Sequence, residues 1–169
     1  EELRENVSIP FEKARAMPPS VYKSEDFLAA ELEHIFMKEW FCVGRSSSLS
    51  EPGDYLTLDL ADQPIIVLRD RSSNIRAMSN VCRHRMSTLL EGRGKTSSVV
   101  CPYHAWTYNL DGSLRGAPAM MLNEDFCKAD YSLATVRCEE WLGWIFVTLN
   151  PQANAVSDDL KGVEAHIHD

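Results

Sequence analysis

The two motifs Cys82-Arg-His84 and Cys101-Pro-Tyr-His104 decide the fold of this chain, and residues 85–100 separate them. Each motif offers one thiolate and one imidazole, so two loops that meet face to face can bring all four side chains together. Two cysteines and two histidines can hold one tetrahedral zinc ion. They can equally hold a 2Fe-2S cluster, with both sulfurs on one iron and both imidazoles on the other. Spacing alone leaves both metal sites open.

The residues around the second motif distinguish these alternatives. Cys101-Pro-Tyr-His-Ala-Trp-Thr-Tyr108, followed by Asn109-Leu-Asp-Gly112, resembles the second cluster loop of Rieske ring-hydroxylating oxygenases. Other stretches that carry the resemblance are Leu49–Tyr55, Ser79–Arg85, Glu91–Gly94, Gly116–Pro118 and Glu139–Gly143. The resemblance implies a Rieske 2Fe-2S domain from the N-terminal part of an oxygenase alpha subunit. It assigns the cluster ligands to Cys82, His84, Cys101 and His104.

The same resemblance implies a set of residues that surround the cluster. These neighbours are Arg83, Arg85, Tyr103, Trp106 and Tyr108. Trp106 stands where the Rieske proteins of respiratory complexes carry a serine, so one hydroxyl donor is missing, whereas Tyr108 is expected to keep a hydrogen bond to sulfur. Because fewer donors stabilise the reduced cluster less, we expect a midpoint potential of about -150 to -100 mV. Met86 departs from the family, in which many relatives carry a small residue after Arg85.

The charge of the chain excludes some classes of partner. The 169 residues include 17 basic and 25 acidic side chains, for a net charge of -8. This balance argues against binding to nucleic acid or to an anionic membrane surface. A local group of basic residues is nevertheless expected near the motifs, formed by Arg83, Arg85, Arg93 and Lys95. A solvated loop and a docking surface for an acidic electron donor are the two alternatives for this group.

The remaining cysteines and the lack of apolar segments bear on location. Cys42, Cys127 and Cys138 are odd in number and have no disulfide framework spacing, which is typical of a reducing compartment. The start of the sequence has no apolar signal region, and no run of about eighteen apolar residues occurs. We therefore expect a cytoplasmic protein without a membrane anchor.

Short apolar patterns predict mainly β structure. Residues 55–60 alternate between leucine and polar or aromatic residues, and residues 65–68 form a continuous apolar run. Strands at 75–81 and 99–100 lead directly into the two motifs, which places both ligand pairs at strand ends. Further strands are expected at residues 40–43, 106–108, 135–138 and 144–149. These short strands favour an antiparallel sandwich or small barrel, and the resemblance implies a Rieske-type antiparallel β-sandwich with two cluster-binding loops.

Three segments are expected along the chain. Residues 1–20 lack periodicity and are interpreted as an N-terminal arm. Residues 21–152 form the Rieske domain, which begins with a helix capped by Ser24. Residues 153–169 are interpreted as a linker and short C-terminal helix. In the resembled family a catalytic domain follows there, with a mononuclear non-haem iron held by two histidines and a carboxylate.

The leading hypothesis is one-electron transfer through the cluster to a mononuclear iron oxygenase site, for O2-dependent hydroxylation or demethylation. The chain alone is not a complete catalyst in this interpretation. The implied partners are a reductase or ferredoxin as electron donor and the catalytic domain of a neighbouring subunit in a homotrimer. The alternatives are a stand-alone Rieske ferredoxin and a zinc-stabilised interaction module. Aromatic acids and N-methylated quaternary amines both remain open as substrate classes.

Overall fold

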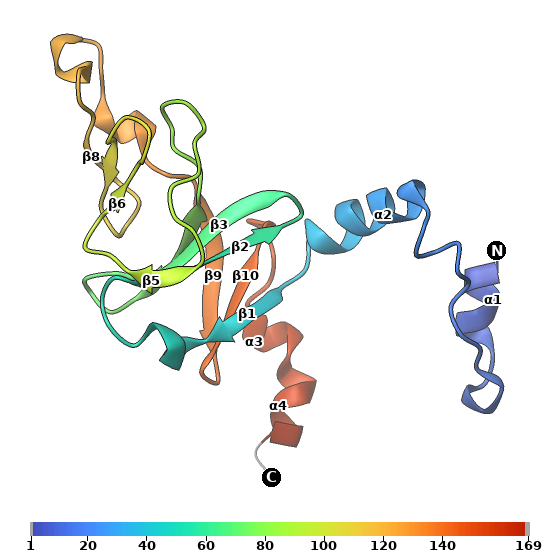
Figure 1. The fold of residues 1–169 in the computed structure, drawn as a ribbon. Helices are drawn as coiled ribbons and strands as arrows, with labels where there is room; N and C mark the ends of the chain where they lie inside the picture. Colours follow the sequence, from blue (N-terminus) through green and yellow to red (C-terminus); the bar gives the residue numbers. More distant parts are fainter. Residues whose placement is uncertain (1, 168–169) are drawn as a thin grey trace.

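The strands that the alternating leucines predict form the centre of the molecule. The computed structural model describes residues 2–167 (Figure 1). Strands β2 (Asp54–Leu60), β3 (Gln63–Arg69) and β4 (Ile75–Ser79) form two successive antiparallel hairpins. The four residues 65–68 of β3 are fully buried, as their continuous apolar run predicts. The hairpin from β3 to β4 delivers the chain to the first motif.

Two antiparallel sheets are built around these hairpins. The larger sheet has the strand order β1-β10-β9-β4-β3-β2-β5, and the smaller sheet has the order β6-β7-β8. The strands outside the central hairpins are β1 (Phe41–Arg45), β5 (Arg93–Lys95), β6 (Val99–Val100), β7 (Thr107–Tyr108), β8 (Leu114–Gly116), β9 (Thr135–Trp141) and β10 (Trp144–Thr148). The mainly β, antiparallel architecture is therefore confirmed.

Helices lie at both ends of the described chain. They are α1 (Glu2–Ser8), α2 (Glu25–Glu31), α3 (Val156–Asp159) and α4 (Lys161–Ile167). Ser24 caps α2 as expected, because its hydroxyl accepts the Phe27 N–H at 3.1 Å. Figure 1 shows α1 and α2 extending away from the sheets. No helix within residues 2–167 is both long enough and apolar enough to cross a membrane.

Short helical turns complete the secondary structure of the described residues. They are η1 (Phe11–Lys13), the π-helix η2 (Leu32–Phe36), η3 (Ser46–Leu49), η4 (Met120–Leu122) and η5 (Lys128–Tyr131). The predicted N-terminal arm, residues 1–20, contains α1 and η1. Glu1, the first residue of that arm, lies outside the described residues. His168 and Asp169, in the predicted segment 153–169, also lie outside them.

Strand β5 was not predicted, because it is short, polar and exposed along its length. It pairs with β2, where Gly94 lies against Tyr55 so closely that an added Cβ would come within 2.9 Å of the Tyr55 hydroxyl. The expected basic group is consequently divided between two elements. Arg93 and Lys95 lie on this edge strand, whereas Arg83 lies in the loop that follows β4.

A polar corner ties the C-terminal helices to the larger sheet. The Arg137 guanidinium on β9 donates to the main-chain carbonyls of Ala153 and Asn154, and it pairs with Glu139 at 2.8 Å. The other Glu139 oxygen accepts the Val156 N–H at 2.8 Å, at the start of α3. The indole of Trp40 donates to the Asn154 carbonyl at 3.0 Å. The guanidinium carbon of Arg137 lies over the same indole, 5.1 Å from the ring centroid. Residues before β1 and after β10 therefore meet at one place.

The turn between β3 and β4 depends on a buried carboxylate. Asp70 accepts the N–H groups of Ser72 and Asn74 at 2.8 and 2.9 Å, and Arg76 Nε donates to it at 2.5 Å. Burial alone would raise the pKa of Asp70, but the Arg76 bond and the backbone bonds outweigh burial and lower it.

We predict that Asp70→Asn lowers the free energy of unfolding by about 2 kcal/mol near neutral pH, because hydrogen bonds to the charged carboxylate are lost. The folded-state pKa of Asp70 lies below the unfolded value, so its stabilisation is complete above the unfolded pKa and is lost as the pH falls through the folded pKa. Urea unfolding at neutral and acidic pH checks this, with the exposed Asp59→Asn as control. An equal loss at both pH values would contradict the argument.

Candidate metal centre

The two motifs adopt the same turn in the main chain. In each loop the cysteine carbonyl accepts the N–H of the fourth residue after it, Met86 or Ala105, at 3.0 Å. Each cysteine N–H in turn donates to the carbonyl of the fifth residue after it, at 2.9 Å for Cys82 and 2.8 Å for Cys101. Met86 and Ala105 also share a left-handed conformation, with φ of 55° and 57°. The structure therefore presents the two motifs as a repeated unit.

Regular structure holds both loops at their bases. The buried Asn80, which follows β4, uses its side chain to donate to the Leu90 carbonyl at 2.8 Å and to accept the Leu90 N–H at 2.9 Å. These two bonds close the first loop like a pair of strand bonds. The second loop connects β6 to β7, and its base is the pairing of Val99 with Tyr108. Both loops lie at strand ends, as the sequence predicts.

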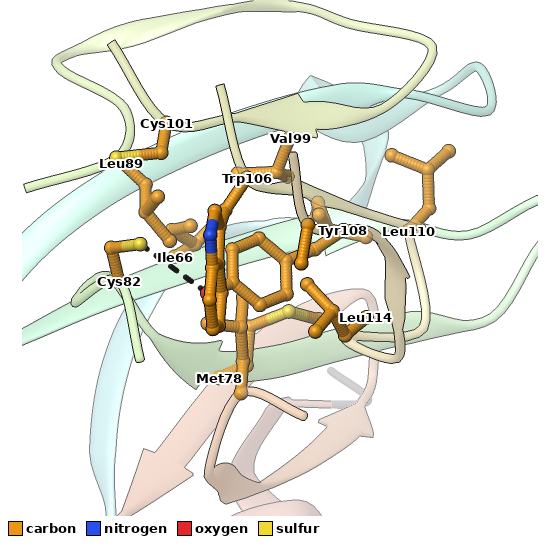
Figure 2. Packing of buried hydrophobic residues seen from close by; sticks show 13 residues of the cluster. Ile66, Met78, Cys82, Leu89, Val99, Cys101, Trp106, Tyr108, Leu110 and Leu114 are labelled. Carbon is orange, nitrogen blue, oxygen red and sulfur yellow. Dashed lines mark hydrogen bonds between the residues drawn. The ribbon is translucent and has the colours of Figure 1, made fainter. Parts of the chain in front are cut away.

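The two sulfurs lie in the apolar core beneath the loops. Cys82 and Cys101 are 0% and 2% exposed, and they belong to the cluster of buried residues drawn in Figure 2. The Tyr108 hydroxyl lies 3.3 Å from the Cys82 sulfur and accepts the Arg83 N–H at 3.0 Å. Burial, together with the neighbouring Cys82, raises the pKa of Tyr108, so the phenol keeps its proton. Tyr108 is therefore placed to donate to the Cys82 sulfur.

The surroundings of Cys101 favour a thiolate. Burial alone would raise the pKa of the Cys101 thiol, but hydrogen bonds from the backbone of Tyr103 and His104 lower it. The side chains of Cys82 and Ser87 also hydrogen-bond to Cys101 and lower its pKa further. Metal ligation requires the deprotonated sulfur, so the site is prepared for it.

The two imidazoles lie together beside the sulfurs. The ring centroids of His84 and His104 are 4.7 Å apart, and the rings meet edge to face at 71°. Burial, and then the charges of His104 and Arg85, lower the pKa of His84, which favours the neutral ring that a metal requires. The Nδ1 atom of His84 is buried without a hydrogen-bond partner in the described part of the chain. A buried polar atom of this kind needs a partner, and a metal ion would supply one.

The four side chains are thus sorted by chemical type. Both sulfurs are buried and contact each other, whereas His104 is exposed and His84 is partly exposed. Within residues 2–167, no group of three or more His, Cys, Asp or Glu side chains is placed so that it could hold one metal ion. Paired sulfurs and paired imidazoles suit a 2Fe-2S cluster, in which soft thiolates bind one iron and imidazoles the other. The donor set therefore fits the group that the resemblance implies.

The predicted neighbours all lie near these four side chains. Trp106 stacks on His84 with ring centroids 4.8 Å apart, and Tyr103 lies over His104 with centroids 3.9 Å apart. Tyr108 contacts sulfur, Arg83 contributes its main-chain N–H to Tyr108, and Arg85 acts on His84 through its charge.

The structure adds residues to the site that the sequence pattern does not identify as part of it. They are Asn80, Ser87, Phe126 and Tyr131. For Ser87 a signal exists, because it follows Cys82 by the same interval that separates Trp106 from Cys101. Phe126 and Tyr131 lie in a segment without periodicity, and no local pattern identifies them.

Comparison with known proteins agrees with this geometry. A family model described as the Rieske [2Fe-2S] domain matches residues 39–127, which include both motifs. The chain belongs to the Rieske [2Fe-2S] domain family. Its cofactor is therefore a 2Fe-2S cluster, and the zinc alternative is set aside. Soft sulfur donors in the core and histidines at the surface are the features of the structure that agree with this assignment.

Individual relatives are subunits of Rieske oxygenases. The carnitine monooxygenase oxygenase subunit of Acinetobacter baumannii is 39% identical over 96% of this chain and 44% of its own length. A solved quaternary ammonium Rieske monooxygenase, described in terms of carnitine oxidation and inter-subunit electron transfer, has a TM-score of 0.85 and 38% identity over 92% of this chain and 43% of its own. Naphthalene 1,2-dioxygenase from Rhodococcus sp. has a TM-score of 0.84 and 32% identity, over 89% of this chain and 35% of its own. This chain spans less than half the length of these proteins.

We predict that Tyr108→Phe lowers the midpoint potential of the cluster by about 40 mV. The variant loses one hydrogen bond to sulfur, worth about 1 kcal/mol, that stabilises the more negative reduced state. A spectroscopic redox titration measures the change. The control is Tyr22→Phe, because Tyr22 is 76% exposed and lies outside the two sheets. An unchanged potential in a Tyr108→Phe protein with full iron content would contradict the assigned bond.

Proposed function

We propose that this chain is the electron-transfer part of a Rieske non-haem iron oxygenase. Its cluster ligands are Cys82 and Cys101 on the inner iron and His84 and His104 on the outer iron. The observation that carries the proposal is the sorting of these four side chains, with the sulfurs in the core and the imidazoles toward solvent. When bound, the cluster supplies one-electron redox chemistry at a potential above that of all-cysteine clusters.

The residues of this chain hold the ligands and control their surroundings. Burial keeps water from the sulfurs, and Tyr108 donates to Cys82 from the core side. The exposed His104 offers the edge through which an electron can pass to a partner. Tyr103, which is 61% exposed, covers one face of that imidazole and extends the surface around it. A partner that docks there would reach the ligand directly.

The proposal assigns two kinds of partner. A reductase or ferredoxin donates the electron, and a catalytic domain of a neighbouring subunit, within a homotrimer, receives it. The similarity to a solved quaternary ammonium monooxygenase for which inter-subunit electron transfer is described supports the second assignment. We place the receiving mononuclear iron, held by two histidines and a carboxylate, in a catalytic domain beyond residue 169, and the protein in the cytoplasm. The boundaries at residues 20 and 152 belong to the same proposal.

For the substrate we propose an N-methylated quaternary amine, which would be hydroxylated and demethylated. Both the carnitine monooxygenase subunit and the quaternary ammonium monooxygenase exceed the naphthalene dioxygenase in identity to this chain, at 39% and 38% against 32%. The pocket that would recognise the substrate lies in the proposed catalytic domain.

The ligand assignment predicts that Cys82→Ser and Cys101→Ser each abolish cluster binding. Each substitution removes one thiolate ligand. Because cluster binding and loop folding are coupled, the loops also lose the structure that the cluster stabilises. The measurement is iron and acid-labile sulfide per chain after anaerobic reconstitution, with the EPR signal of the reduced protein. Cys42→Ser is the matched control, since Cys42 is exposed on β1. A full complement of iron and sulfide in either ligand variant would refute the assignment.

The substrate proposal is tested with the complete oxygenase subunit and an electron donor. We expect carnitine or another trimethylammonium compound to stimulate oxygen uptake and to be converted to product in proportion. Aromatic acids serve as the comparison set. Product formed from an aromatic acid, with no response to quaternary amines, would exclude the proposed substrate class while leaving the electron-transfer role intact.

A further inference from the structure

The segment after β8 has no role in the function described so far. Residues 117–131 show no sequence periodicity, and the structure gives them only the short turns η4 and η5. This segment nevertheless returns to the metal centre. Phe126 and Tyr131 both pack edge-on against the indole of Trp106, with ring centroids 5.7 and 5.5 Å from it.

Trp106 connects these two rings to a cluster ligand. Its indole is 1% exposed and lies flat on the His84 imidazole, with an angle of only 5° between the planes. Figure 2 shows the indole within the same buried group as Cys82 and Tyr108. Phe126 and Tyr131 also contact each other, at 4.8 Å between centroids. The imidazole of His84 and these three aromatic rings therefore form one continuous group of ring contacts.

Hydrogen bonds hold this segment in place. The Leu133 N–H donates to the Gly112 carbonyl at 2.9 Å, at the tip of the hairpin that leaves the second loop. The Lys128 ammonium donates to the Arg115 carbonyl on β8 at 3.1 Å. The hairpin that follows Trp106 therefore sets the position of Phe126 and Tyr131.

The two histidine ligands differ in this respect. His84 is only partly exposed, and the buried indole covers one face of its ring. His104 is exposed, and its aromatic neighbour Tyr103 is itself exposed. The packed aromatic group is thus specific to one side of the site.

We infer that Trp106, Phe126 and Tyr131 form an aromatic wall that positions the His84 ring and excludes water from its side of the cluster. A flat indole fixes the plane of the imidazole, and with it the direction of the unpartnered Nδ1 atom. Phe126 and Tyr131 are positioning residues, since they act on His84 only through Trp106. The inference rests on the proposed electron-transfer function and assigns a task to residues 126–131.

The wall should influence how easily the cluster is reduced. Reduction adds one negative charge, and a dry, apolar boundary stabilises that charge less than water does. An opening in the wall therefore favours the reduced state and raises the midpoint potential. The effect is opposite in sign to the one expected for Tyr108→Phe, because that change removes a hydrogen-bond donor.

The test compares Phe126→Ala and Trp106→Phe with Trp141→Phe in the reconstituted chain. Trp141 is a core tryptophan on β9 that packs edge-on against Phe146. We expect Phe126→Ala to increase the equilibrium constant for reduction about tenfold, which is about 59 mV for one electron. The EPR line shape should change in both wall variants, because the orientation of the His84 ring changes. Trp141→Phe should lower thermal stability and leave the potential unchanged.

The outcomes separate the wall from ordinary core packing. If the wall variants lose stability as Trp141→Phe does, with unchanged potential and EPR spectrum, the inference is overturned. Should Trp106→Phe fail to fold, the half-buried Phe126 still decides the question, because it acts on His84 only through the indole. Suppose that the unsubstituted chain titrates as a one-electron centre and Phe126→Ala changes neither the potential nor the EPR spectrum. That result would reject the aromatic wall and leave the proposed electron-transfer function intact. Absence of acid-labile sulfide from the unsubstituted chain would reject the proposed function as well.

Discussion

Two thiols must lie together in an apolar core while two imidazoles beside them face solvent, and the rest of the structure depends on this constraint. The chain satisfies this constraint by forming the same main-chain turn at Cys82 and at Cys101. In both loops the cysteine closes the turn through its own N–H and carbonyl, so its side chain is directed inward and the histidine is left nearer the surface. Asn80 closes the first loop at its base, and the pairing of β6 with β7 closes the second.

Much of this arrangement could be predicted from the sequence, for physical reasons that differ between elements. The strands around residues 65–68 carry an uninterrupted apolar run, which indicates burial on both faces. The spacing of two cysteines and two histidines predicts a metal site, and the structure brings these four side chains together. Ser24 was recognised as a cap because acidic residues follow it in the first turn.

Other features depend on contacts between distant residues and leave no local pattern. Strand β5 is polar and short, and it becomes a strand only because β2 offers a free edge. Phe126 and Tyr131 belong to the site through their contacts with Trp106, which is not their neighbour in sequence. The basic residues that are close in sequence are divided by the fold between a loop and an edge strand.

The corner around Arg137 has a mechanical consequence. One guanidinium bonds to the segment that leads into α3 and lies over Trp40, where the N-terminal helices join the sheet. A rotation of either helical segment would break bonds that the other segment shares. Force applied to either of them is therefore passed to the same strand, β9, which pairs with β4 and so leads to the first cluster loop. Both helical segments are thereby anchored to the strand that lies beside β4.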